Sequence, residues 1–100
     1  MDLEYFKENI LDELAGAKDY IIRAIEIKPM QITWSKMLFD MSLQELGHAT
    51  HLYNMFNEYC SIMGRTYADL PEYVKEIRNE IVEEYAKQSA EIKLMQESLK

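Results

Sequence analysis

Three kinds of residue are scarce in this 100-residue chain: it contains three glycines, two prolines and one cysteine. With only Cys60, the chain can form neither an internal disulfide nor a zinc site built from several thiolates. Few glycines and prolines, 48% hydrophobic and 29% charged residues argue against disorder and favour a compact helical protein. No stretch reaches the ~20 apolar residues of a membrane span, and the N-terminus has no signal-like apolar run. We therefore expect one all-α domain over residues 1–100, located in the cytoplasm.

Basic residues are also in the minority. Lysine and arginine number 11 against 18 acidic residues, and the formal net charge is −7. A negative field repels nucleic acid and anionic membrane surfaces, so neither is expected as a partner. The same field attracts cations, and metal ions are therefore compatible with this composition.

Hydrophobic residues recur at alternating steps of three and four, the period of a helix with one buried face. The pattern predicts helices over about residues 3–28, 34–63 and 70–98. In the first helix the stripe comprises Leu3, Phe6, Ile10, Glu13, Ala17, Tyr20, Ala24 and Ile27. In the second it comprises Trp34, Leu38, Met41, Glu45, His48, Leu52, Met55, Tyr59 and Ile62. We expect both stripes to face the core, with Leu11, Leu14, Ile21 and Ile25 at the edges of the first.

Residues that favour helix ends lie near these boundaries: Asp2, Pro29, Thr33 or Ser35, Gly64, Asp69 and Pro71. The connection between the first two helices is only a few residues long, which predicts an antiparallel hairpin. The third helix has polar residues in the middle of its stripe. Two interpretations remain open: it crosses away from the hairpin and packs on another subunit, which we favour, or its middle contributes polar groups to a site.

Three polar side chains interrupt the two stripes at one height. Glu45 and His48 are three residues apart and share a helix face. In an antiparallel hairpin that turns near residue 30, Glu13 lies level with His48, and Gly16 lies level with Glu45. A buried carboxylate is costly unless a cation or hydrogen bonds compensate it, so these residues indicate metal binding. The alternative is an ordinary polar pair on a partly exposed helix. His51 is interpreted as a surface residue or as a group beside the site, with metal ligation as the less favoured alternative.

The arrangement of Glu13, Tyr20 and the Glu45–His48 pair resembles the first half of a ferritin-like di-iron protein. The resemblance covers roughly residues 3–60. In that superfamily, two helices each supply a Glu and two others each supply a Glu-x-x-His to a pair of metals. The resemblance implies Glu13, Glu45 and His48 as ligands of iron, with manganese or zinc as other fitting metals. Tyr20 corresponds to the tyrosine that ferritins keep near the iron pair and is implied to act in catalysis.

This chain holds half of the superfamily's ligand set, because neither histidine lies in the third helix. It is thus similar to half-ferritins, in which hairpins from two chains form a four-helix bundle around a shared site. The resemblance implies at least a homodimer that oxidises Fe(II), and it suggests an encapsulin-like shell as a further partner. The last residues, Met95 to Lys100, lack the apolar, glycine-containing tail of shell-targeted proteins, which argues against storage. The alternative function is a non-catalytic helical oligomerisation module that keeps the same fold.

Overall fold

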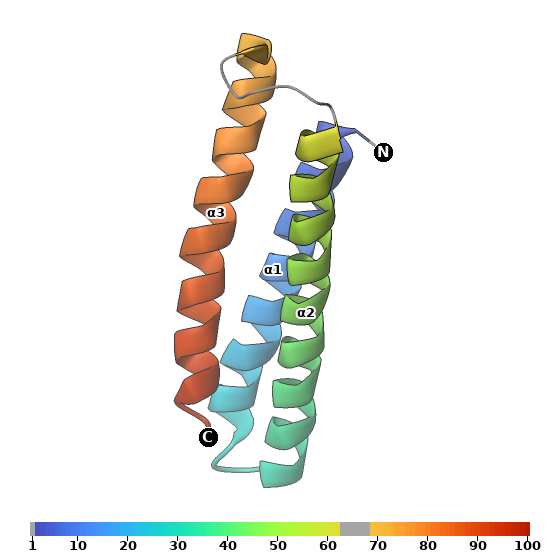
Figure 1. Cartoon of the computed structure of the whole chain (residues 1–100). Helices are drawn as coiled ribbons and strands as arrows, with labels where there is room; N and C mark the ends of the chain where they lie inside the picture. The colour runs from blue at the N-terminus through green and yellow to red at the C-terminus, as the bar shows by residue number, and fades with distance from the viewer. Residues whose placement is uncertain (1, 63–68) are drawn as a thin grey trace.

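The computed structural model describes residues 2–62 and 69–100, and these ranges contain three helices and no strand. The helices are α1 (Leu3–Ile27), α2 (Ile32–Ile62) and α3 (Glu72–Glu97). The prediction of an all-α protein is confirmed. As Figure 1 shows, α1 and α2 run antiparallel through a short connection, and α3 lies alongside them. The rod measures 54 × 19 × 18 Å, so its long dimension is set by the helix length and its width by the side-by-side packing.

The helix ends agree with the sequence signals only in part. Asp2 caps α1 as expected, since its carboxylate accepts a hydrogen bond from the Tyr5 amide at 2.9 Å. The second cap was predicted wrongly, because α2 begins at Ile32 and so includes both Thr33 and Ser35. The cap expected from Asp69 is wrong as well. Pro71 occupies the N-cap position of α3 and provides no side-chain hydrogen bond. Gly64, the expected end of α2, lies outside the described residues.

The buried face of α1 is rotated relative to the predicted stripe. Leu14 and Ile21, which were expected at its edge, are fully buried, whereas Glu13 and Tyr20 are only half-buried. The rotation has a simple cause: α1 is covered by α3 as well as by α2. The core around it unites apolar residues from all three helices, namely Leu3, Phe6, Ile10, Leu14, Ala17, Leu46, Ala49, Phe56, Val74, Ile81 and Ile92.

The favoured interpretation of α3, that it leaves the hairpin for another subunit, is wrong. Two ion pairs join α3 to α1, between Lys7 and Glu80 at 3.0 Å and between Lys18 and Glu91 at 3.5 Å. Its buried apolar residues belong to the same core as those of α1. The polar middle of α3 is accommodated because Gln88 donates a hydrogen bond to Glu84 at 2.7 Å on its own helix.

The predicted core stripe of α2 is largely exposed in the single chain. Exposure is 57% at Trp34, 39% at Met41, 41% at Met55 and 81% at Ile62. The buried residues of α2 are instead Ser35, Ser42, Leu46, Ala49 and Phe56. Small side chains let α1 approach this second face closely, and the buried serine hydroxyls donate hydrogen bonds to carbonyl oxygens of α1 at 2.7 Å. The helix therefore has two candidate packing faces, and the chain covers only one of them.

None of the described helices combines the length and the apolar character that crossing a membrane requires.

Candidate metal centre

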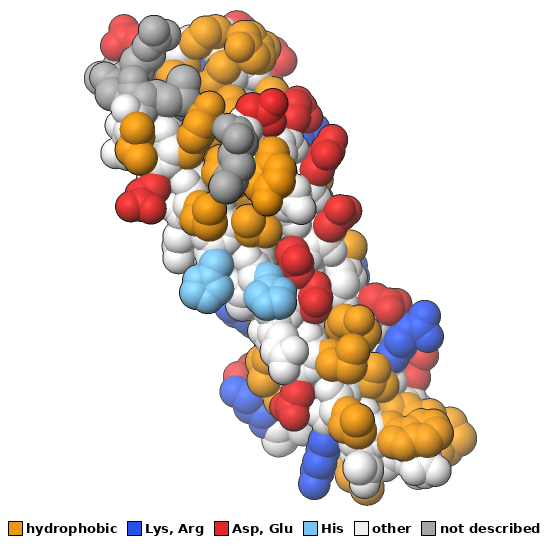
Figure 2. All heavy atoms as spheres, turned by 90° about the vertical axis from the view of Figure 1, so that its right-hand side faces the viewer, with side chains coloured by type: hydrophobic (Ala, Val, Ile, Leu, Met, Phe, Trp, Pro, Cys, Tyr) orange, Lys and Arg blue, Asp and Glu red, His pale blue; other side chains and the backbone are white. Residues whose placement is uncertain are grey.

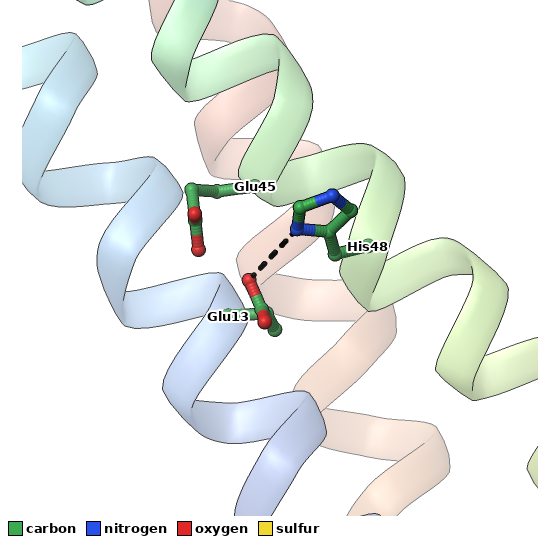
Figure 3. Close-up of side chains that lie close together, drawn as sticks. All are labelled: Glu13, Glu45 and His48. Carbon is green, nitrogen blue, oxygen red and sulfur yellow. Dashed lines mark ion pairs between the residues drawn. The ribbon is translucent and has the colours of Figure 1, made fainter.

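Glu13, Glu45 and His48 come together near the middle of the hairpin. Glu13 comes from α1, and the other two come from α2, as Figure 3 shows. One ligand atom from each residue, a carboxylate oxygen or an imidazole nitrogen, lies within 4.8 Å of the other two. Among the described residues, this is the group of acidic, histidine or cysteine side chains that is close enough to hold one ion. The structure thus brings together all three residues that the sequence predicted as metal ligands.

The local folding of the hairpin explains this convergence. The turn between Ile27 and Ile32 is tight, because the Ile27 carbonyl accepts hydrogen bonds from the amides of Met30 and Gln31. The short turn fixes which residues of α1 and α2 lie at equal height, and Glu13 consequently faces His48, with Glu13 Oε2 3.5 Å from His48 Nδ1.

Gly16 makes room for the second carboxylate. A Cβ atom at this position would lie 3.0 Å from Glu45 Oε2, closer than ordinary van der Waals contact. The carboxylate therefore lies over the glycine backbone, where α1 presents no side chain. Sequence reasoning placed Gly16 level with Glu45 but did not identify its role in making room for the carboxylate. The signal was available, because a glycine inside a helix costs about 1 kcal/mol and needs a reason.

The electrostatic environment of the two carboxylates is unfavourable without a cation. Glu13 Oε2 is buried from solvent and takes part in no hydrogen bond with the described residues. The pKa of Glu45 is raised by the adjoining Glu13 carboxyl, which acts as a hydrogen-bonding neighbour, and by burial. The charge of His48 opposes this rise. Two close acidic groups and a buried oxygen without a hydrogen-bond partner form a site that a positive ion would stabilise.

Two further residues from the sequence analysis stand outside this group. Tyr20 is half-buried on α1, and its hydroxyl makes no hydrogen bond to Glu13 or Glu45 among the described residues. Its catalytic role stays a prediction. His51 is exposed and lies outside the group of Glu13, Glu45 and His48, in keeping with its interpretation as a surface residue.

The donor set is one imidazole nitrogen and two carboxylates, which suits divalent iron, manganese or zinc. The half-buried Glu13 and Glu45 form its inner side, and His48, whose side chain is 58% exposed, forms its outer side. In Figure 2 the two histidines lie on the α2 face of the molecule, with acidic side chains beside one of them. The site is therefore open on the side where α2 has no neighbour within the chain.

No relative was found. Comparisons of this chain with protein-family models, with curated proteins and with solved structures gave no match. The functional argument consequently depends on the chemistry and geometry of the site.

Proposed function

We propose that this chain is a ferritin-like metal-binding protein that holds a di-iron carboxylate site between two copies and oxidises Fe(II). The observation that carries the proposal is the convergence of Glu13, Glu45 and His48 around a buried oxygen that has no hydrogen-bond partner. A second copy related by two-fold symmetry would add the same three residues and complete a four-helix bundle. The resemblance of the ligand pattern to ferritin-like proteins supports iron as the metal.

In this proposal the residues of the chain have distinct roles. Glu13 and Glu45 bind iron through their carboxylates, and their negative charges compensate the positive charge of the metal. His48 supplies the nitrogen ligand and is held near Glu13 by the hairpin. Tyr20 donates a hydrogen bond toward a ligating carboxylate once metal is bound. Bound Fe(II) supplies one-electron chemistry, with oxygen or peroxide as the oxidant.

Anaerobic titration with Fe(II) tests the proposal. About one iron per chain should bind, and ferric absorbance should rise rapidly after oxygen is admitted. Glu45→Ala and His48→Ala should lose both binding and oxidation. His51→Ala is the matched control, because it removes an exposed imidazole one turn away that lies outside the ligand group. Absence of iron binding by the parent protein, or equal loss in the control, would contradict the proposal.

A second candidate function is favoured by a different observation. The exposed apolar residues of α2, including Trp34 and Met55, suit a non-catalytic module that drives oligomerisation. In that case the chain would associate without binding metal. The iron titration therefore distinguishes the two functions, because only the first predicts stoichiometric binding.

A further inference from the structure

The exposed stripe of α2 continues on both sides of the metal ligands. Toward the hairpin turn it contains Trp34, Leu38 and Met41, and toward the other end it contains Leu52, Met55 and Tyr59. Trp34, Met41 and Met55 are exposed, and the other three are half-buried. Leu52 and Tyr59 also pack against the chain's own core, so only part of each side chain belongs to the exposed face. Figure 2 shows hydrophobic side chains gathered above and below the histidines on this face. A contiguous apolar face interrupted by metal ligands indicates an interface whose polar centre is functional.

From Trp34 to Tyr59, the spacing and the apolar or polar character of the stripe positions are the same from either end. Residues whose numbers add up to about 93 lie at equal height when two such helices pack antiparallel around a two-fold axis between Leu46 and Gly47. Trp34 then lies level with the second copy's residue 59, Leu38 with its residue 55, and Met41 with its residue 52. Glu45 lies level with residue 48 of the other copy. Each of these six apolar positions thus lies level with another of the six, and a carboxylate lies level with an imidazole.

A parallel arrangement lacks this complementarity at the centre. It would place the two copies of Glu45 at the same height, so that like charges would face each other in a poorly solvated interface. The antiparallel register also brings an exposed apolar side chain level with a hollow on the other copy. A hollow of about 340 Å³ is lined by Trp34, Met37, Leu38 and Met41. The side chains that arrive level with this hollow from the second copy are those of residues 52, 55 and 59, and Met55 is exposed and able to insert.

We infer that α2 packs antiparallel against α2 of a second copy, with the two-fold axis between Leu46 and Gly47. The occupant of the exposed face is a second copy because the ligand group is open on this side and the stripe is self-complementary. The inference rests on the proposed function for its two-chain site and adds the surface and register by which the copies meet. In this arrangement α3 stays on the outside of the bundle, on the α1 side of each hairpin.

Sedimentation velocity of the full chain, with and without added Zn²⁺, tests the surface. The parent should sediment as a dimer, and Trp34→Glu should shift it to a monomer. Leu94→Glu is the matched control, because Leu94 is 74% exposed on α3, away from the inferred interface. Helical circular dichroism of both variants verifies that each chain is folded. A parent that is monomeric under both conditions, or a control that dissociates equally, overturns the inference.

A charge exchange tests the register. Leu38→Glu or Met55→Lys alone should dissociate the dimer, whereas the double variant Leu38→Glu/Met55→Lys should restore it. The two positions are ~25 Å apart within one α2 helix, so rescue requires contact between copies. Parallel packing would place each introduced charge against the same charge of the other copy and would give no rescue. Absence of rescue therefore overturns the antiparallel register. A rescued dimer without iron binding refutes the proposed function alone, and a parent dimer that binds iron but whose double variant shows no rescue refutes this inference alone.

Discussion

At the scale of single residues, the place of the Glu45 carboxylate on α2 depends on the absence of a side chain at a glycine on α1. The Glu45 carboxylate lies over Gly16 and beside the carboxyl of Glu13. Two glycine substitutions separate these local effects from the general effect of glycine on helix stability.

Gly16→Ala should weaken metal binding, because the new Cβ would meet Glu45 Oε2 at 3.0 Å and displace the carboxylate. Gly47→Ala is the control, since a Cβ there meets nothing within 4 Å. The control should leave metal affinity unchanged and raise the free energy of unfolding by roughly 0.5–1 kcal/mol. Metal titration and chemical denaturation of both variants measure these effects. Equal metal affinities in the two variants would show that Gly16 does not shape the site.

Glu45→Gln should stabilise the metal-free protein at neutral pH. The neighbouring Glu13 carboxyl and burial raise the pKa of Glu45 above its ordinary 4.5 in the folded chain. The folded state therefore holds this proton more tightly, and the associated stability is present below pH 4.5 and lost as pH rises through the raised pKa. Melting temperatures in the presence of a chelator should differ at pH 7 and converge near pH ~4. A variant that melts below the parent at pH 7 would contradict this expectation.

Metal affinity should rise with pH over the same range. Binding requires the deprotonated carboxylate, and the raised pKa of Glu45 means that a metal ion competes with a proton for this group. Calorimetric titrations with Zn²⁺ between pH 5 and 7, in buffers of different ionisation enthalpy, measure both affinity and proton release. The Glu45→Gln variant should bind more weakly at every pH and release fewer protons. A pH-independent affinity in the parent would exclude Glu45 as a ligand.

At the scale of the helices, α2 shows that a helical hydrophobic repeat does not by itself determine which face of the helix is buried. Its large apolar residues lie at helical spacing and indicate a core, yet the chain buries a neighbouring face of serine, alanine and a few large residues. Ser42 holds this arrangement together. Its hydroxyl donates to the Ala17 carbonyl at 2.7 Å and accepts from the Gln96 amide at 3.0 Å, so that one side chain links all three helices.

Ser42→Ala should destabilise the chain by about 1–3 kcal/mol, because it removes the hydrogen bond to the Ala17 carbonyl and leaves the buried Gln96 amide without its Ser42 partner. Ser35→Ala is the matched comparison. It removes one hydrogen bond, to the Ala24 carbonyl at 2.7 Å, and leaves no side-chain donor unsatisfied. The cost should therefore be smaller at Ser35. Urea denaturation of both variants gives the two free energies of unfolding, and equal values would argue against the three-helix link.

At the scale of the whole molecule, the rod is narrow and presents a long apolar face. Its radius of gyration is 15.9 Å, against ~13 Å for a typical 100-residue domain. An elongated chain has more surface for the same volume, so a larger share of its apolar residues stays exposed. In the proposed dimer, packing two rods along α2 would reduce this surface and enclose Glu13, Glu45 and His48, so that assembly and metal binding would be linked.

Metal should strengthen the dimer, because ions held by residues of both copies bind the assembled state better than the separate chains. We expect the dimer dissociation constant to fall by about 5- to 150-fold when Zn²⁺ is added. Sedimentation equilibrium over a range of protein concentrations measures this change. In His48→Ala the metal effect should vanish while the metal-free dimer persists. An identical dissociation constant with and without metal in the parent would show that the two events are independent.

The sequence alone was sufficient to predict the local features of the fold. Helical periodicity specified three helices, Asp2 specified the first cap, and the short connection at Pro29 specified the antiparallel hairpin. These features together placed Glu13 level with His48, because height along a helix depends only on residue number. Fold class and candidate ligands follow from local rules that do not depend on distant parts of the chain.

Tertiary packing decided which face each helix buries. The sequence offered α2 two faces, and only the approach of α1 and α3 selected the one with Ser35, Ser42 and Ala49. The same packing rotated the buried face of α1 toward Leu14 and Ile21 and kept α3 on its own hairpin. Hydrophobic attraction has no direction, so periodicity identifies apolar faces but not their neighbours. Neighbours are fixed by shape, by the small residues that permit close approach, and by the hydrogen bonds that buried polar groups must complete.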